Sequence, residues 1–253
     1  ISIPSSIVCI SEGSFEGCSS LVEFTIPSSI TSIELNVFRN CRSLCKIEIP
    51  SSVTTIGNGS FSDCTKITQL TIPSSVTKIC QFAFKNCCKL TEITIPSSIN
   101  EIEDGTFCGC RSLTQITIPS LVTKIGKFVF SYCNSLTKIE IPSSIVEIGQ
   151  KAFKSCSSLK EVILPTSIRT IPSGLFCYCK SLNKIDIPSS VTEIESYVFD
   201  GCSSINSINI PETVTKIGPY AFRNSSINNV NIPAKLKTIE KGLFSKLYQY
   251  ERK

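Results

Sequence analysis

The chain has 253 residues, with 25 Lys and Arg against 20 Asp and Glu, no His and 15 Cys. Its net charge of +5 is spread along the sequence instead of forming a Lys/Arg run, so the charge balance does not favour nucleic acid or an anionic membrane surface. Apolar stretches are only a few residues long, which excludes a transmembrane helix within the sequence, and no signal-peptide pattern is present.

Proline recurs every 23 residues, each time after an aliphatic residue, at Pro4, Pro27, Pro50, Pro73, Pro96, Pro119, Pro142, Pro165, Pro188 and Pro211, and then at Pro233. Phe keeps the same spacing from Phe15 to Phe222, and in nine units Cys follows this Phe by three residues. A fixed period of this length predicts a solenoid, in which each unit buries its apolar face against its neighbours. We therefore expect one elongated domain over residues 1–253, with about eleven units and a degenerate last unit. The start within a repeat and the absence of Met predict a fragment of a longer chain.

Each unit begins with a predicted strand. In the unit at 136–158, residues 136–141 alternate apolar and polar side chains, which is typical of a strand with one solvated face. Pro142 ends this strand because proline has no N–H to donate to a neighbouring strand. Residues 143–144 then form a predicted turn, and residues 145–148 a second short extended segment.

The second half of the unit is predicted to contain a single helical turn, with Phe153 and Cys156 on one side of it. In seven of ten units the residue before the Cys position is of a type that accepts left-handed backbone geometry: Gly17, Asn40, Asp63, Asn86, Gly109, Gly201 and Asn224. Such a residue ends a short helix and redirects the chain. A similar preference for Gly or an aromatic residue lies two positions before each Phe.

The solvated strand face supplies the candidate binding residues. Equivalent residues of adjacent parallel strands lie about 4.8 Å apart, so like charges at these positions would repel. No neighbours along the two outward columns share a sign, and we expect cross-strand pairs Glu23/Lys46 and Lys138/Glu161/Lys184. The candidate protein-binding face consists of Glu23, Lys46, Glu48, Gln69, Glu92, Gln115, Lys138, Glu140, Glu161, Ile163, Lys184 and Asp186.

The unit reads L-x-x-I-x-I-P-x-S-V-T-x-I-G-x-x-A-F-x-x-C-x-S and is nearly intact at 113–135 and 136–158. It closely resembles the BspA-like class of leucine-rich repeats, which occurs in surface proteins of mucosal bacteria and protozoan parasites. The resemblance implies an α/β solenoid with a parallel sheet on its concave side, and short helical or 3-10 turns with short extended segments on its convex side. It also implies a non-enzymatic protein-binding role in cell-surface adhesion or host-protein interaction, at the cell surface or outside the cell. Ser225 departs from the pattern, since it stands where Cys is expected.

The cysteines are the most obvious candidates for chemistry. A metal site needs several converging ligands, usually with His, and the sequence has no His, so we predict no metal and no cofactor. The Cys that follow Phe are interpreted as buried free thiols that act as small hydrophobic residues. The six others are expected to be more exposed: Cys9, Cys45, Cys80, Cys88, Cys108 and Cys177. Glu140 and Asp186 are interpreted as parts of a solvated face, so we predict no enzyme activity.

Four apolar residues occupy positions that are otherwise polar: Val22, Cys45, Leu121 and Ile163. They fit a surface that binds another protein, and they fit equally the scatter of a degenerate repeat. We expect a monomer whose partner is a protein, with no nucleic acid and no membrane insertion of this segment. Two alternatives stay open. An intracellular scaffold or regulatory repeat protein in the cytoplasm would fit the many unpaired cysteines, since such thiols are uncommon in oxidising compartments. The repeats could also form a passive structural stalk.

Overall fold

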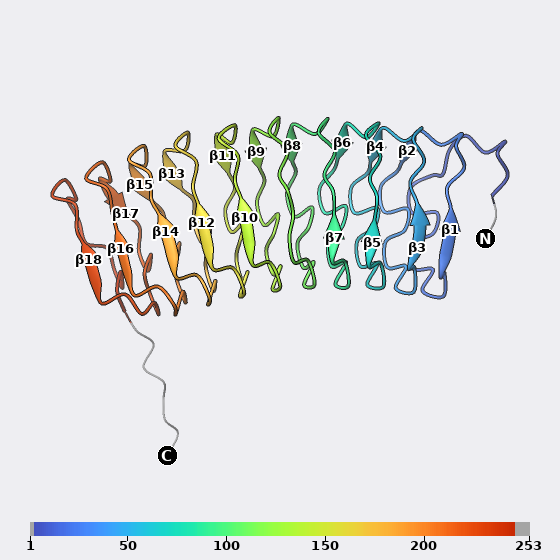
Figure 1. Ribbon diagram of the computed structural model, residues 1–253. Helices are drawn as coiled ribbons and strands as arrows, with labels where there is room; N and C mark the ends of the chain where they lie inside the picture. The colour runs from blue at the N-terminus through green and yellow to red at the C-terminus, as the bar shows by residue number, and fades with distance from the viewer. Residues whose placement is uncertain (1–2, 246–253) are drawn as a thin grey trace, which may run out of the picture.

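The structure is a computed structural model that describes residues 3–245 as a solenoid of stacked units (Figure 1). A typical unit contributes two short strands, one to each of two rows along the solenoid. The first strand row contains β1 (Glu23–Thr25), β3 (Lys46–Glu48), β5 (Gln69–Leu70), β7 (Glu92–Ile93), β10 (Lys138–Glu140), β12 (Glu161–Ile163), β14 (Lys184–Asp186), β16 (Ser207–Asn209) and β18 (Asn229–Asn231). The second strand row contains β2 (Ser32–Ile33), β4 (Thr55–Ile56), β6 (Lys78–Ile79), β8 (Glu101–Ile102), β9 (Lys124–Ile125), β11 (Glu147–Ile148), β13 (Thr170–Ile171), β15 (Glu193–Ile194) and β17 (Lys216–Ile217).

The strand pairs are all parallel and join equivalent residues of adjacent units, as the 23-residue period predicts. In β3, for example, Ile47 points into the core, while Lys46 and Glu48 are exposed. The first strand row is interrupted between β3 and β5, between β7 and β10, and between β14 and β16. The row is therefore a series of short sheets aligned end to end.

The core is one continuous cluster that extends from Ile10 to Leu243. Its centre is a column of Phe rings that runs from Phe15 to Phe244, with one ring from each unit. Successive ring centroids lie 5.4 to 5.8 Å apart and their planes are inclined by 3 to 17°. The prediction that Phe and the register Cys both point inward is confirmed, since Phe61 and Cys64 are fully buried.

The expected helical turns are wrong. The described residues contain no helix, and therefore none long enough and apolar enough to cross a membrane. Around Phe61 the backbone is left-handed at both Gly59 (φ 60°) and Asp63 (φ 63°), which interrupts any helical ladder. Ser62 N–H donates to the Gly59 carbonyl (2.9 Å), whereas Phe61 N–H donates to the carbonyl of Ala83 in the next unit (2.8 Å). The chain thus forms consecutive turns that alternate local bonds with bonds between units, and we call this part of the surface the turn side.

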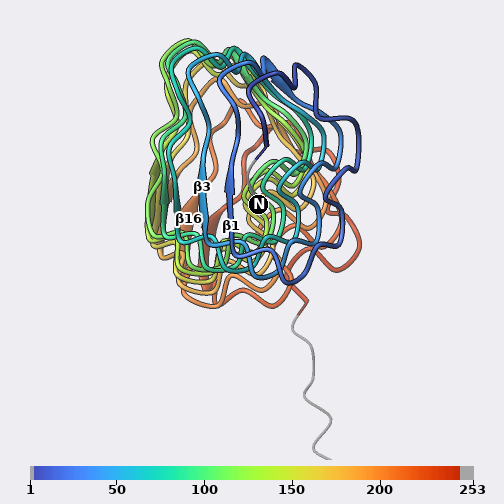
Figure 2. The ribbon, with the colours of Figure 1, turned by 90° about the vertical axis from the view of Figure 1, so that its right-hand side faces the viewer.

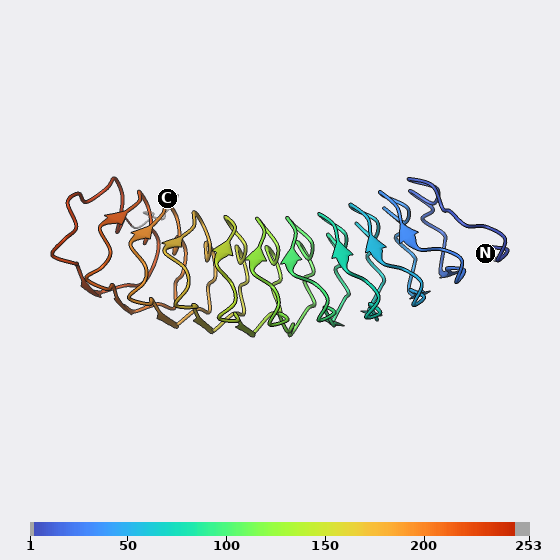
Figure 3. The same cartoon turned by 90° about the horizontal axis from the view of Figure 1, so that it is seen from above.

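The concave placement of the first strand row is also wrong. Figure 3 shows a shallow arc, with both ends displaced to the same side. In the end-on view of Figure 2, the strands of the first row lie on the side where the middle units extend beyond both ends, so this row lies on the outer side of the arc. Helices would make the opposite side of each unit wider than the strands. The turn side has none among the described residues, and its units are joined closely by backbone hydrogen bonds of 2.7 to 3.2 Å, such as the one that ends on Ala83.

Candidate protein-binding face

The twelve residues of the candidate face all lie on the outward surface of the first strand row. They come from seven strands and from Gln115 in the intervening unit. All are exposed except Glu161, which is half-buried. The pairing of β1 with β3 places Glu23 beside Lys46, and the pairings of β12 place Glu161 between Lys138 and Lys184. The sequence-based register of this face is therefore correct.

Two of the expected cross-strand ion pairs are present. Lys184 Nζ lies 2.6 Å from Glu161 Oε1, and Lys46 Nζ lies 3.9 Å from Glu23 Oε2. The hydrogen bond that Lys184 donates to Glu161, together with the charge of Glu161, raises the pKa of Lys184 above its ordinary value. These side chains are 46 to 74% accessible to solvent, and such pairs contribute less than about 1 kcal/mol to the free energy of unfolding. They align neighbouring units more than they stabilise them.

The third expected pair, between Lys138 and Glu161, does not form, because Lys138 has a different partner. Lys138 Nζ donates to Glu140 Oε1 on its own strand at 2.7 Å, although Glu161 is its neighbour on the next strand. Alternate residues of a strand point to the same face, so Glu140 is as accessible to Lys138 as a cross-strand partner. The hydrogen bond raises the pKa of Lys138 and lowers the pKa of Glu140.

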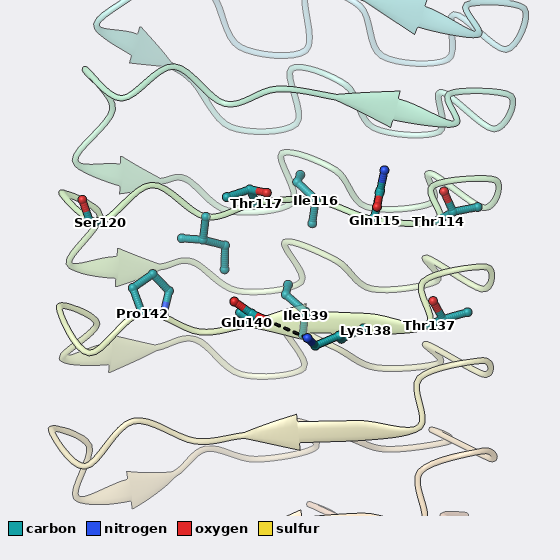
Figure 4. Close-up of a pocket in the computed structure, with 11 residues that line it drawn as sticks. Thr114, Gln115, Ile116, Thr117, Ser120, Thr137, Lys138, Ile139, Glu140 and Pro142 are labelled. Atoms are coloured by element: carbon teal, nitrogen blue, oxygen red, sulfur yellow. Dashed lines mark hydrogen bonds and ion pairs between the residues drawn. The ribbon is translucent and has the colours of Figure 1, made fainter.

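A shallow hollow of about 590 Å³ opens on this face between two adjacent units (Figure 4). It is lined by Thr114, Gln115, Ile116, Thr117, Ile118, Ser120, Thr137, Lys138, Ile139, Glu140 and Pro142. The hollow lies where the first strand row is interrupted: residues 113–118 form no strand, and a long bond from Thr137 N–H to the Thr114 carbonyl (3.4 Å) links the two segments. The Lys138–Glu140 pair lies along its side. The hollow can accept a polar side chain from a partner, but it is open rather than enclosed.

Ile163 is the apolar centre of the charged face. It is 63% exposed at the end of β12 and lies between Glu140 on β10 and Asp186 on β14. Leu121 (61% exposed), Val22 and Cys45 are exposed as well, as the sequence predicts. Ile163 alone among these four lies at the end of a strand with charged residues on both neighbouring strands.

The turn side carries a set of exposed aromatic residues that were not expected from the sequence. Phe128, Tyr132, Tyr178 and Tyr197 are each 36 to 43% exposed, all at left-handed backbone positions. Cations cover several rings: Lys154 Nζ lies 5.7 Å from the centroid of Tyr132, and Arg223 lies over Tyr197 at 5.3 Å. Their signal was the occurrence of aromatic residues at positions that otherwise favour Gly or Asn.

Glycines make room for the rings. In the unit after Phe82, the backbone of Gly105 is left-handed (φ 62°), and a Cβ added there would lie 2.3 Å from the Phe82 ring. The Phe82 ring therefore leaves no room for a side chain at residue 105, and the rings of Tyr178 and Tyr220 lie in the same way against Gly201 and Gly242. Phe128 and Tyr197 are instead followed by Lys151 and Tyr220, which lie over their rings.

The register thiols are buried and hydrogen-bonded. In eight successive units the Cys thiol donates to the carbonyl of the Phe in the preceding unit, at 3.0 to 3.3 Å. Burial is the main cause that raises their pKa, to about 11 for Cys41 and well above the ordinary value for Cys87. Thiols in this state are neutral and poorly reactive.

The six other cysteines differ in exposure. Cys9 and Cys45 are exposed, and Cys80, Cys88 and Cys108 are half-buried. The expectation of exposure is wrong for Cys177, which is 7% exposed and lies 4.0 Å from the carboxylate of the buried Asp200. All fifteen thiols are free, and residues 3–245 contain no cluster of three or more His, Cys, Asp or Glu that could hold a metal ion.

The comparisons with known proteins agree with this architecture. A model of the BspA type leucine-rich repeat region matches the chain six times, over residues 1–110, 77–204 and 169–252. A leucine-rich repeat protein from Bacteroides ovatus is similar to the chain at 28% identity, over 94% of this chain and 80% of that protein, with a TM-score of 0.58. A leucine rich cell surface protein from Faecalibacterium prausnitzii is similar at 30% identity, over 87% of this chain and 68% of that protein, with a TM-score of 0.61.

A leucine-rich repeat protein from Treponema pallidum is similar at 31% identity, over 72% of this chain and 82% of that protein, with a TM-score of 0.57. None of the curated proteins compared with the chain matches it. The matched repeats include the prolines, phenylalanines and cysteines that set the unit length and build the core. The chain belongs to the BspA-type leucine-rich repeat family.

Proposed function

We propose that the chain is a non-enzymatic module that binds another protein at the cell surface, and that it does so through the candidate face on the first strand row. The cell-surface location is supported by the similarity to a protein from F. prausnitzii that is described as a cell surface protein. A rigid array with a constant core and variable outward positions suits recognition, because the partner can be changed without changing the fold.

The observation that carries this proposal is the position of Ile163. A large aliphatic side chain that is 63% exposed has no role in the core, and charged residues surround it on both neighbouring strands. Protein interfaces concentrate their binding free energy on a few apolar or aromatic side chains within a polar rim. The hollow beside Lys138 and Glu140 lies next to this position and adds shape to an otherwise flat surface.

The test compares two apolar-to-polar variants with equal exposure. Val146 is also 63% exposed, but it precedes the second strand row at β11. The wild-type chain, Ile163→Ser and Val146→Ser are passed over a panel of purified extracellular host proteins, and dissociation constants are measured by biolayer interferometry. We expect Ile163→Ser to weaken binding at least about tenfold, which corresponds to about 1.4 kcal/mol, and Val146→Ser to bind as the wild type does.

Equal affinities for wild type and Ile163→Ser towards a protein that the chain binds would contradict this choice of face. A passive stalk makes a different prediction. If two central units, residues 93–138, are removed in register, a stalk keeps its function, whereas a binding face loses affinity.

An intracellular scaffold is the second candidate, and the fifteen free thiols favour it. Protein isolated from its native source and labelled with an alkylating reagent separates the two. Full labelling of the exposed Cys9 and Cys45 supports a reducing compartment, whereas blocked thiols or attached glycans support the cell surface.

A further inference from the structure

The solenoid has an edge whose charged residues are all cationic. The edge consists of the two residues that follow each register Cys, in the lower row of loops in Figure 1 that lead into the first strand row. We call it the lower edge. Its charged members are Arg42, Lys66, Lys89, Arg111 and Lys180, and almost all its other members are Ser, Thr or Asn. The first four lie in four consecutive units.

These four cations are not neutralised by the protein. All are exposed, and none forms an ion pair with any residue in the described part of the chain. Asp63 directly precedes a register Cys, but its carboxylate oxygens accept hydrogen bonds from Ser62 Oγ (2.8 Å) and Asn86 Nδ2 (3.0 Å). The positive charge of this edge is therefore available to a ligand.

The fold creates this row from residues that are far apart in the sequence. Between Arg42 and Arg111 the units stack at steps of 5.4, 5.6 and 5.7 Å, measured between Phe ring centroids. Net charge that is spread evenly along the chain is thus gathered along one side of the solenoid. The other surfaces differ. The candidate face carries six carboxylates and three lysines. The two residues that follow each register proline, from Ser5 to Ser190, are all uncharged.

The chemistry of the lower edge identifies the class of ligand. Between Arg42 and Arg111 it holds no aromatic side chain on which a nucleic-acid base could stack. It also has no aliphatic anchor of the kind that dominates protein interfaces. What it offers is a line of cations with neighbouring hydroxyl groups, from Ser43, Thr65 and Ser112. Such a line of cations matches a linear polymeric ligand that carries regularly spaced anionic groups and many hydroxyl groups.

We propose that the lower edge from Arg42 to Arg111 binds a linear acidic polysaccharide through the sulfate or carboxylate groups of that polysaccharide. Binding is electrostatic and releases counterions, so it weakens as salt increases. With a slope of roughly −0.7 per contact, as for single-stranded polyanions, four contacts lower the affinity by about fiftyfold between 50 and 200 mM salt. This surface is separate from the candidate protein-binding face, and either can exist without the other.

The test uses a fluorescent heparin oligosaccharide as the probe, with anisotropy titrations at several salt concentrations. The edge variant replaces all four cations by Gln: Arg42→Gln, Lys66→Gln, Lys89→Gln and Arg111→Gln. The matched control removes the same charge from exposed positions elsewhere that are also outside ion pairs: Lys127→Gln, Arg169→Gln, Lys235→Gln and Lys237→Gln. Thermal unfolding verifies that both variants are folded, which we expect because all eight side chains are exposed.

We expect the edge variant to bind heparin at least about tenfold more weakly than the wild type at 100 mM salt, with a shallower dependence on salt. The control variant should keep most of the wild-type affinity and salt dependence. Equal losses in the two variants would overturn the proposal, because they would indicate attraction by net charge alone. An edge variant that binds heparin as the wild type does would also overturn it. The same titration with polyglutamate and with single-stranded DNA decides the class of polyanion. Tighter binding of either than of heparin would contradict a polysaccharide.

Discussion

The thiol of Cys64 donates a hydrogen bond to the carbonyl oxygen of Phe38 in the preceding unit, over 3.0 Å. The same geometry recurs from Cys41 to Cys202, so the register cysteines join units as well as fill space. In the unit of Phe222 the register position, three residues after the Phe, is occupied by Ser225. Its hydroxyl turns instead to the carbonyl of Phe222 in its own unit, at 2.6 Å.

Replacement of Ser225 by Cys should therefore stabilise the C-terminal unit. The longer side chain can reach the carbonyl of Phe199, and because a thiol is a weak donor the gain in the free energy of unfolding should be less than about 1 kcal/mol. Hydrogen exchange of the amides between Phe222 and Leu243 should slow relative to the wild type. Ser225→Ala is the control, since it has no donor; exchange that is equally fast in Ser225→Cys and Ser225→Ala would rule out the bond.

Alkaline pH should destabilise the solenoid through the buried thiols. Burial raises the pKa of Cys41 to about 11 in the folded chain, from an ordinary value of 9.0. Above pH 9 the unfolded chain releases thiol protons that the folded chain retains, so the free energy of unfolding falls as pH rises. Below pH 9 the thiols are neutral in both states, and this effect is absent.

The measurement is urea denaturation between pH 7.5 and 10. Cys87→Ala combined with Cys110→Ala should flatten the decline, because two thiols with strongly raised pKa are removed. A decline that is as steep in this variant as in the wild type would assign the effect to other groups.

Phe130→Ala should break the continuity of the Phe column. Phe130 is fully buried and stacks on Phe107 and Phe153 at 5.8 and 5.5 Å, so truncation should cost about 3–5 kcal/mol. Because units contact only their neighbours, the two halves should then unfold separately. Phe128→Ala, two residues away and 37% exposed, is the control and should keep the wild-type transition. A single sharp transition in Phe130→Ala would contradict nearest-neighbour coupling.

The ion pair between the buried Asp200 and the half-buried Arg223 should contribute more than the exposed pairs. The Asp200 side chain is only 2% exposed and accepts hydrogen bonds from Arg223 Nε at 3.0 Å and Nη2 at 2.7 Å. Asp200→Asn leaves the guanidinium without its partner and should cost about 2 kcal/mol, less than for a fully buried pair because Arg223 stays partly solvated. Glu161→Gln, which removes the carboxylate partner of Lys184 on the solvated strand face, should cost less than about 1 kcal/mol. If Asp200→Asn and Glu161→Gln lower the free energy of unfolding equally in chemical denaturation, burial does not make the first ion pair stronger than the second.

The sequence predicted the parts of the fold that repeat. The spacing of Pro, Phe and Cys assigned inward and outward positions correctly, and the charges along the strand face predicted the register of Glu161 between Lys138 and Lys184. These predictions succeed because an in-register stack imposes the same environment on every unit, and thus repeats each constraint many times.

The errors concern geometry that a residue pattern does not specify. A Phe three residues before a Cys fits one helical turn, but the two left-handed residues around Phe61 produce consecutive turns instead. The direction of curvature depends on the relative widths of the two sides. The helical turns expected from the Phe–Cys spacing and from the resemblance made the prediction of a concave sheet wrong. The choice of Lys138 between Glu140 and Glu161 depends on rotamers, which charge alternation leaves open. The lower edge was missed because its cations alternate between the first residue after the register Cys (Arg42, Arg111) and the second (Lys66, Lys89), and so form no single column in the repeat.

The direction of the bonds between units determines how the molecule responds to a pulling force. The inter-unit backbone bonds, such as that from Phe61 to Ala83, join each unit to the next along the solenoid. A load applied to the two ends is therefore carried by all interfaces in series, and the interface with the weakest bonding opens first. The weak points are the three interruptions of the first strand row, between β3 and β5, between β7 and β10, and between β14 and β16. Under tension the array should extend at these interruptions before the Phe column separates elsewhere.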